Sequence, residues 1–68
     1  AMSNVFNEVD QILANMNKGD TRTFHRNDYR SEDDWVSVWH YLCVDKINSN
    51  RVEVIEKKEP LTFTIRKS

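Results

Sequence analysis

The chain has 68 residues, of which 38% are hydrophobic and 31% charged, with two Trp, two Tyr, three Phe and single Gly, Pro and Cys residues. This composition predicts one folded domain spanning residues 1–68, because it is too apolar for a disordered tail and has no apolar run long enough to cross a membrane. The formal net charge of −1 gives no bulk electrostatic attraction to nucleic acid or to anionic lipid.

The N-terminus and the single cysteine bear on the cellular compartment. Ala1 before Met2 is interpreted as a cloning remnant, and the residues after it do not follow the basic, apolar and small-residue order of a secretory signal. Cys43 has no second cysteine with which to form an internal disulfide. We therefore expect a reducing, cytoplasmic compartment.

The first predicted element is a helix over residues 3–18. Its apolar residues recur at helical spacing and form one face, made of Val5, Phe6, Val9, Ile12, Leu13 and Met16. Ser3 or Asn4 is expected to cap the start of this helix. Gly19 follows at the position where a residue with left-handed backbone geometry commonly ends a helix.

Residues 20–30 have a weaker pattern. Thr21, Thr23 and Phe24 favour an extended chain, whereas residues 27–30 contain turn-forming side chains. We predict a short strand followed by a short turn or helix.

A second, longer helix is predicted over residues 31–47, with Ser31 and Asp34 spaced as in a capping box. Its apolar surface spans two adjacent faces, one made of Trp35, Val38, Trp39 and Leu42 and the other of Val36, His40, Cys43 and Ile47. We expect the core to take Trp39 and Leu42, which leaves Trp35 or Tyr41 partly exposed to a partner. The alternative is that Trp35 folds back over the C-terminal segment and Tyr41 lies flat on the surface.

After the turn-forming residues 48–50 the apolar period changes to two. Val52 and Val54 alternate with polar residues, and the same alternation is made later by Leu61, Phe63 and Ile65. This pattern predicts an antiparallel hairpin with one packed face and one solvated face, joined through the charged connection 57–60.

The predicted order of helix, short extended piece, short turn or helix, longer helix and hairpin resembles that of small winged helix-turn-helix domains over nearly the whole chain. The resemblance implies an α+β, winged-helix-like domain that binds DNA as a regulatory module, and a dimer is expected. It places helix 31–47 in the major groove and Lys57 and Lys58 at the tip of the wing. The side chains then expected on phosphates are Arg22, Arg26, Arg30, Lys57 and Lys58, and those expected near bases are Ser37, His40 and Tyr41.

A rival hypothesis is a small interaction protein, of the phage or mobile-element kind, that binds and inhibits or redirects a larger host protein. Three successive carboxylates open helix 31–47, and they would repel DNA where base edges and phosphates approach. They fit an acidic patch facing a protein better. The residues expected at such an interface are Glu32, Asp33, Trp35 and Tyr41.

His40 and Cys43 are the strongest candidates for chemistry, because their spacing brings them together on a helix. They supply two metal ligands, and His25 adds at most a third, whereas a structural zinc site needs four. We therefore favour a packed thiol beside a half-buried imidazole. The pair also lacks an orienting residue, an oxyanion hole and a glycine-rich phosphate loop. We therefore predict a non-enzyme with no metal, cofactor or small-molecule substrate.

Overall fold

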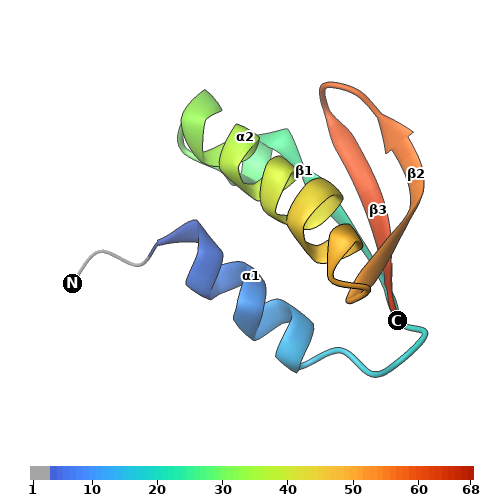
Figure 1. Ribbon diagram of the computed structural model, residues 1–68. Helices are drawn as coiled ribbons and strands as arrows, with labels where there is room; N and C mark the ends of the chain where they lie inside the picture. The colour runs from blue at the N-terminus through green and yellow to red at the C-terminus, as the bar shows by residue number, and fades with distance from the viewer. Residues whose placement is uncertain (1–3) are drawn as a thin grey trace.

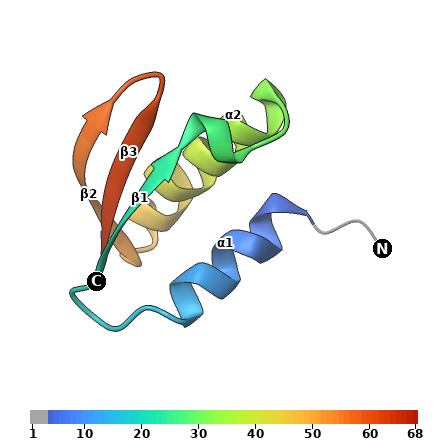
Figure 2. The ribbon, with the colours of Figure 1, turned by 180° about the vertical axis from the view of Figure 1, so that it is seen from behind.

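Residues 4–68 of the computed structural model form an α+β arrangement of two helices and one three-stranded antiparallel sheet (Figure 1). Helix α2 (Glu32–His40) lies across one face of the sheet, and α1 (Val5–Ala14) lies beside α2 on the same side (Figure 2). The strand order is β1 (Thr21–His25), β3 (Thr62–Lys67), β2 (Val52–Lys58). The predicted α+β class is confirmed, but the sheet contains one strand more than the expected hairpin.

Helix α1 forms where the apolar period predicts it, although it is shorter than expected. The Asn4 side chain accepts a hydrogen bond from the Asn7 backbone N–H at 2.9 Å and caps the helix start. The helix ends at Ala14, before the expected residue 18, because Asn17 and Asp20 close a local turn through two hydrogen bonds of 2.9 Å. The expected start at Ser3 and the interpretation of Ala1 fall outside residues 4–68.

The short extended piece is confirmed as β1, and a single 3₁₀ turn, η1 (Arg26–Asp28), follows it. Strand β1 pairs with the central strand, and Phe24 lies opposite Phe63 with their rings stacked at 5.3 Å. On the other face of the same strands, the hydroxyls of Thr23 and Thr64 are 2.7 Å apart. The sheet therefore packs Phe24 and Phe63 toward the helices, whereas Thr23 and Thr64 lie on its outer face.

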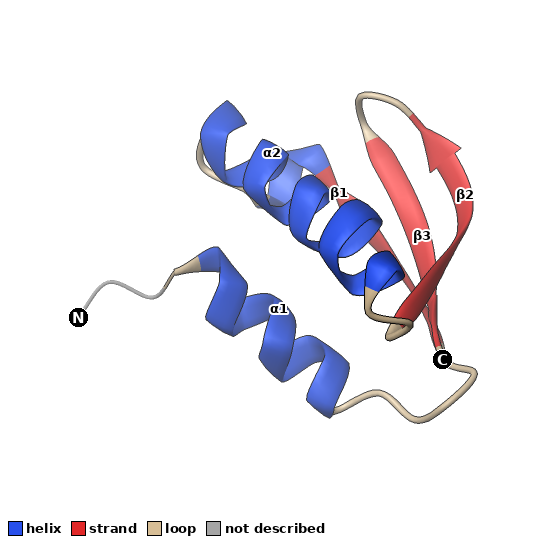
Figure 3. Cartoon of the chain, viewed as in Figure 1, coloured by secondary structure: helices blue, strands red, loops and turns tan. Residues whose placement is uncertain are grey.

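The second helix begins as predicted, because the Ser31 hydroxyl accepts from the Asp34 backbone N–H at 3.1 Å. After His40 the helix widens into a π-helical segment, η2 (Tyr41–Lys46), and continues along the same axis (Figure 3). Leu42 and Ile47 are five residues apart, and both pack into the core. The wider π turn brings such residues to one face, which an ordinary α-helical turn does not.

The C-terminal hairpin is confirmed, with a bulge in β2 between Val54 and Glu56. The connection between the strands is shorter than expected. Lys57 and Lys58 belong to β2, where they lie opposite Phe63 and Thr62. The prediction that both lysines occupy the tip of a wing is therefore wrong, since strand pairing continues through Lys58.

Both helices and all three strands contribute to one core of buried side chains: Val9, Leu13, Phe24, Trp35, Val38, Leu42, Val52, Phe63 and Ile65. Trp35 is 4% exposed, whereas Trp39 is only partly buried, so the expectation that the core takes Trp39 is wrong. The alternative holds for Trp35, whose ring lies 5.3 Å from Phe63 of the hairpin. No helix within residues 4–68 is long and apolar enough to cross a membrane.

Candidate functional site

A groove of about 270 Å³ lies between α2 and the turn that joins β2 to β3. Residues from both walls line this groove, which we call the α2–turn groove: Glu32, Trp35, Val36, Trp39, Glu59, Pro60 and Thr62. Trp35 is buried, whereas Val36 is 52% exposed. The groove therefore presents apolar side chains to solvent between two separate elements of the fold.

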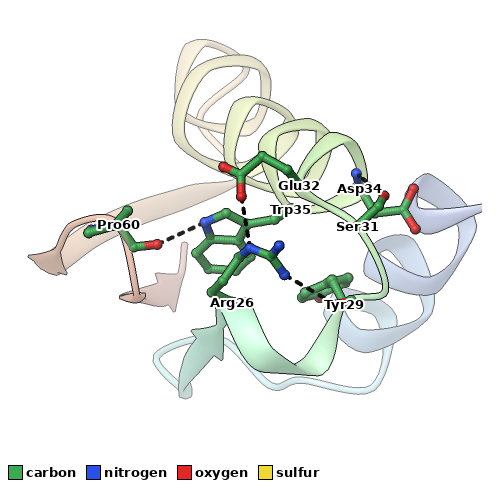
Figure 4. Close-up of polar contacts among 7 residues, drawn as sticks. All are labelled: Arg26, Tyr29, Ser31, Glu32, Asp34, Trp35 and Pro60. Atoms are coloured by element: carbon green, nitrogen blue, oxygen red, sulfur yellow. Dashed lines mark hydrogen bonds and ion pairs between the residues drawn. The ribbon is translucent and has the colours of Figure 1, made fainter.

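Trp35 holds the two walls of the groove together. Its indole Nε1–H donates a hydrogen bond to the carbonyl oxygen of Pro60 at 2.9 Å, which connects α2 directly to the hairpin turn (Figure 4). A buried indole N–H needs such a partner, because leaving it unsatisfied costs about 1–3 kcal/mol. The spacing of the walls is thus set by a hydrogen bond at the floor of the groove.

Arg26 supplies a second brace beside the groove. Its Nε donates to a carboxylate oxygen of Glu32 at 3.0 Å, and its Nη1 donates to the carbonyl of Tyr29 at 3.3 Å (Figure 4). The backbone N–H of Arg26 donates to the carbonyl of Leu61 at 2.8 Å. One residue therefore joins η1, the first turn of α2 and the hairpin turn.

Charge around the groove is mainly negative. Glu32 and Glu59 lie on opposite walls, and Asp33 and Asp34 follow Glu32 at the start of α2. Carboxylates at this end of a helix are stabilised by its dipole, which accounts for their presence without a ligand. Lys57 contributes a positive charge, with its Nζ 5.1 Å from the centroid of the Trp39 ring.

Cys43 lies further along the second helix and is partly buried. Burial raises the pKa of its thiol to about 11, against a usual value of 9.0, while Lys57 lowers this pKa and Glu59 raises it. The thiol is therefore protonated near neutral pH and is a poor nucleophile. His40, expected to be half-buried, has a side chain that is 61% exposed, with Nδ1 3.9 Å from Asp45.

The basic residues expected to contact phosphates do not converge on one surface. Arg22 lies on the helix-covered face of β1 and lines a separate cavity with residues of α1. Arg26 is occupied by its contacts around η1, while Arg30 is exposed. Lys57 and Lys58 are consecutive in β2 and so point to opposite faces of the sheet.

The residues expected near bases are also separated. Tyr41 contacts α1, where its hydroxyl donates to the Asp10 carboxylate at 2.8 Å and its ring meets Phe6 at 5.0 Å. The Tyr41 side chain is therefore engaged in packing between the helices, and its contact with bases stays a prediction. Ser37 is partly buried and His40 is exposed on α2.

Of the residues expected at a protein interface, Glu32 and Asp33 are exposed. Trp35 forms the floor of the α2–turn groove and does not protrude from the surface. Within residues 4–68, no group of three or more His, Cys, Asp or Glu side chains is placed to hold a metal ion.

Comparisons of the chain with protein-family models, with curated proteins and with solved structures give no match. The winged-helix resemblance therefore rests on the order of the elements alone.

Sequence reasoning missed Val36, Trp39, Glu59 and Pro60 as one group, because the two walls are separated by about twenty residues of chain. The sequence of α2 does contain one indication of this groove. Its apolar residues cover more of the helix than one core-facing stripe requires, which indicates that a second side is used.

Proposed function

We propose that this protein is an interaction module that binds a segment of a larger protein in the α2–turn groove. The observation that carries this proposal is an apolar groove between α2 and the β2–β3 turn. Trp35 forms its floor, and the groove is open to solvent at Val36. Protein interfaces commonly centre on such a pocket, which a large side chain of the partner fills.

The size of the groove favours a protein side chain over a small-molecule ligand. Pockets for small molecules and cofactors usually enclose roughly 300–1,000 Å³. The groove here has about 270 Å³ and is open on one side. It therefore suits one or two anchoring side chains of a bound segment.

The rigidity of the walls also supports binding. The Trp35 bond to Pro60 and the Arg26 contacts to Glu32 and Leu61 hold the groove in shape before a partner arrives. A preorganised site loses less conformational entropy on association than one that must be ordered. Glu32, Trp35 and Pro60, which make these contacts, line the same groove as the exposed Val36.

A photo-reactive side chain placed at position 36 tests the proposal in cells. We expect one discrete cross-linked protein from position 36 and none from Lys18, an exposed control residue outside the groove. The captured protein is then purified, and its affinity is measured by calorimetry for wild type and Val36→Arg. A loss of tenfold or more with Val36→Arg is the expected result. Absence of an adduct at position 36, or equal binding by Val36→Arg, would overturn the proposal.

DNA binding remains a second candidate because α2 precedes the hairpin and the sheet has the order β1-β3-β2, an arrangement compatible with a winged-helix module. Arg30, His40 and Lys58 are exposed and would be the candidate contacts. A gel shift with mixed-sequence duplexes at low salt separates the candidates, with Arg30→Ala plus Lys58→Ala as the matched variant. We expect no retardation at micromolar wild-type protein. Retardation that the double variant loses, with a log-log salt slope near about −2 to −3 for two or three phosphate contacts, would favour DNA.

A further inference from the structure

The two walls of the α2–turn groove each carry a carboxylate. Glu32 comes from the first turn of α2, and its side chain is 68% exposed although Arg26 binds one of its oxygens. Glu59 comes from the hairpin turn and forms no ion pair within the described residues 4–68. The apolar floor therefore lies between two negative charges.

Two cations near this groove, Arg26 and Lys57, offset part of its negative charge. The side chain of Arg26 is only 27% exposed and is held by Glu32 and by the Tyr29 carbonyl. Lys57 lies against the Trp39 ring on the strand side of the groove. Asp33, next to Glu32, adds a further exposed carboxylate.

We infer that the bound segment presents a lysine or arginine next to an apolar anchor, an inference that rests on the proposed function of the groove. The apolar anchor occupies the floor beside Val36 and Pro60. The methylene stem of the basic side chain lies along the wall, and its charged end reaches Glu59 with support from Glu32. An acidic segment would meet like charge on both walls and is disfavoured.

Selection from a display library of random heptapeptides tests this inference on the intact chain. Wild-type protein is expected to enrich peptides with a large apolar residue beside Lys or Arg. Val36→Arg is expected to enrich none of them. Glu59→Lys should shift the selected peptides away from basic residues. The matched control is Glu56→Lys, which makes the same charge change on the outer face of the sheet, opposite Thr64.

The best selected peptide is then used in a double-mutant cycle, with its basic residue replaced by uncharged citrulline or norleucine. We expect this replacement to weaken binding to wild type by about threefold to tenfold, and to have little effect on binding to Glu59→Lys. Affinity is measured by calorimetry after the fold of each variant has been checked by NMR.

The outcomes distinguish failure of the basic-residue preference from failure of the proposed interaction function. Peptides that need Val36 but show no basic preference, or whose basic residue is insensitive to Glu59→Lys, would overturn the inference and leave the interaction module standing. Peptides that bind Val36→Arg as well as wild type, or a library that yields no binder, would overturn both.

Discussion

Trp35 is the residue on which the fold and the groove both depend. Its ring packs between Tyr29 at 5.7 Å and Phe63 at 5.3 Å, and its indole N–H is bonded to Pro60. Packing and hydrogen bonding therefore act on the same side chain. Trp39, four residues later, is only partly buried and covers one wall of the groove.

Replacing Trp35 by Phe is expected to lower the free energy of unfolding by about 1–3 kcal/mol, because it removes the bond to the Pro60 carbonyl and some packed volume. Urea denaturation followed by circular dichroism measures this change. Trp39→Phe is the control and should cost less than about 1 kcal/mol. Equal losses in both variants would contradict the assignment of Trp35 to the core.

Cys43 should react as a partly buried thiol. Burial raises the pKa of its thiol to about 11, so its reaction with a thiol reagent should be slow at pH 7 and increase about tenfold per pH unit. The rate should level off near pH 11. A short unstructured peptide containing one cysteine serves as the control, and it should level off nearer its usual pKa. A plateau for Cys43 below pH 9 would contradict the buried environment.

A side chain from the sheet, Lys67 of β3, caps the C-terminal end of α1. The ammonium group of Lys67 donates to the carbonyls of Leu13 and Met16 at 2.6 and 2.8 Å, at the C-terminal end of α1 where the helix dipole is negative. The basic residue that caps α1 therefore comes from the far end of the chain. No basic residue lies in the helix's own last turn.

Lys67→Met is expected to lower the free energy of unfolding by about 1 kcal/mol, because the methionine keeps the stem and loses both charge-assisted hydrogen bonds. Amide hydrogen exchange should become faster in α1 and change little in β3. Lys18→Met, at an exposed position outside the helix, is the control. Uniform acceleration across the whole chain would show that the cap acts globally and not on α1.

The elements that sequence could predict are those with a strong local period. The stripe of α1 and the alternation in β2 and β3 depend on neighbours in the chain, and so does the Ser31 cap of α2. The pairing of β1 with β3 could not be read from the sequence. Thr21 and Thr23 face outward, and Phe24 finds its partner 39 residues away at Phe63.

The groove was harder to predict for a related reason. Trp35 and Trp39 lie on the same predicted face of α2, but only Trp35 is buried, with its indole N–H bonded to the Pro60 carbonyl. Tyr41, the first residue of the π-helical segment, packs against α1 through Asp10 and Phe6. Both effects come from tertiary contacts that no local pattern contains.

Three titratable side chains in different parts of the fold have pKa values that are raised in the folded state: Tyr29, Cys43 and Lys46. Burial raises the pKa of Cys43 and of Tyr29, and nearby Glu8 and Asp28 add to the effect at Tyr29. Burial alone would lower the pKa of Lys46, but hydrogen bonds and charge from Tyr41 and Asp10 outweigh it, so the pKa is raised. The Lys46 contact lies between the two helices, with Nζ 3.3 Å from Asp10.

Each of these groups holds its proton more tightly in the folded state, so the folded chain binds more protons than the unfolded chain at alkaline pH. Stability is then fully present below the usual pKa values of 9.0 for Cys, 10.0 for Tyr and 10.5 for Lys, and it is lost as pH rises through the raised values.

The urea midpoint is expected to be constant from pH 7 to about pH 8.5 and to fall steadily above pH 9. Cys43→Ala should remove the earliest part of the fall, between about pH 9 and 11, whereas Lys18→Met should leave its position unchanged. A midpoint that rises above pH 9 would contradict the net direction of these shifts, because it requires the unfolded chain to bind more protons than the folded one.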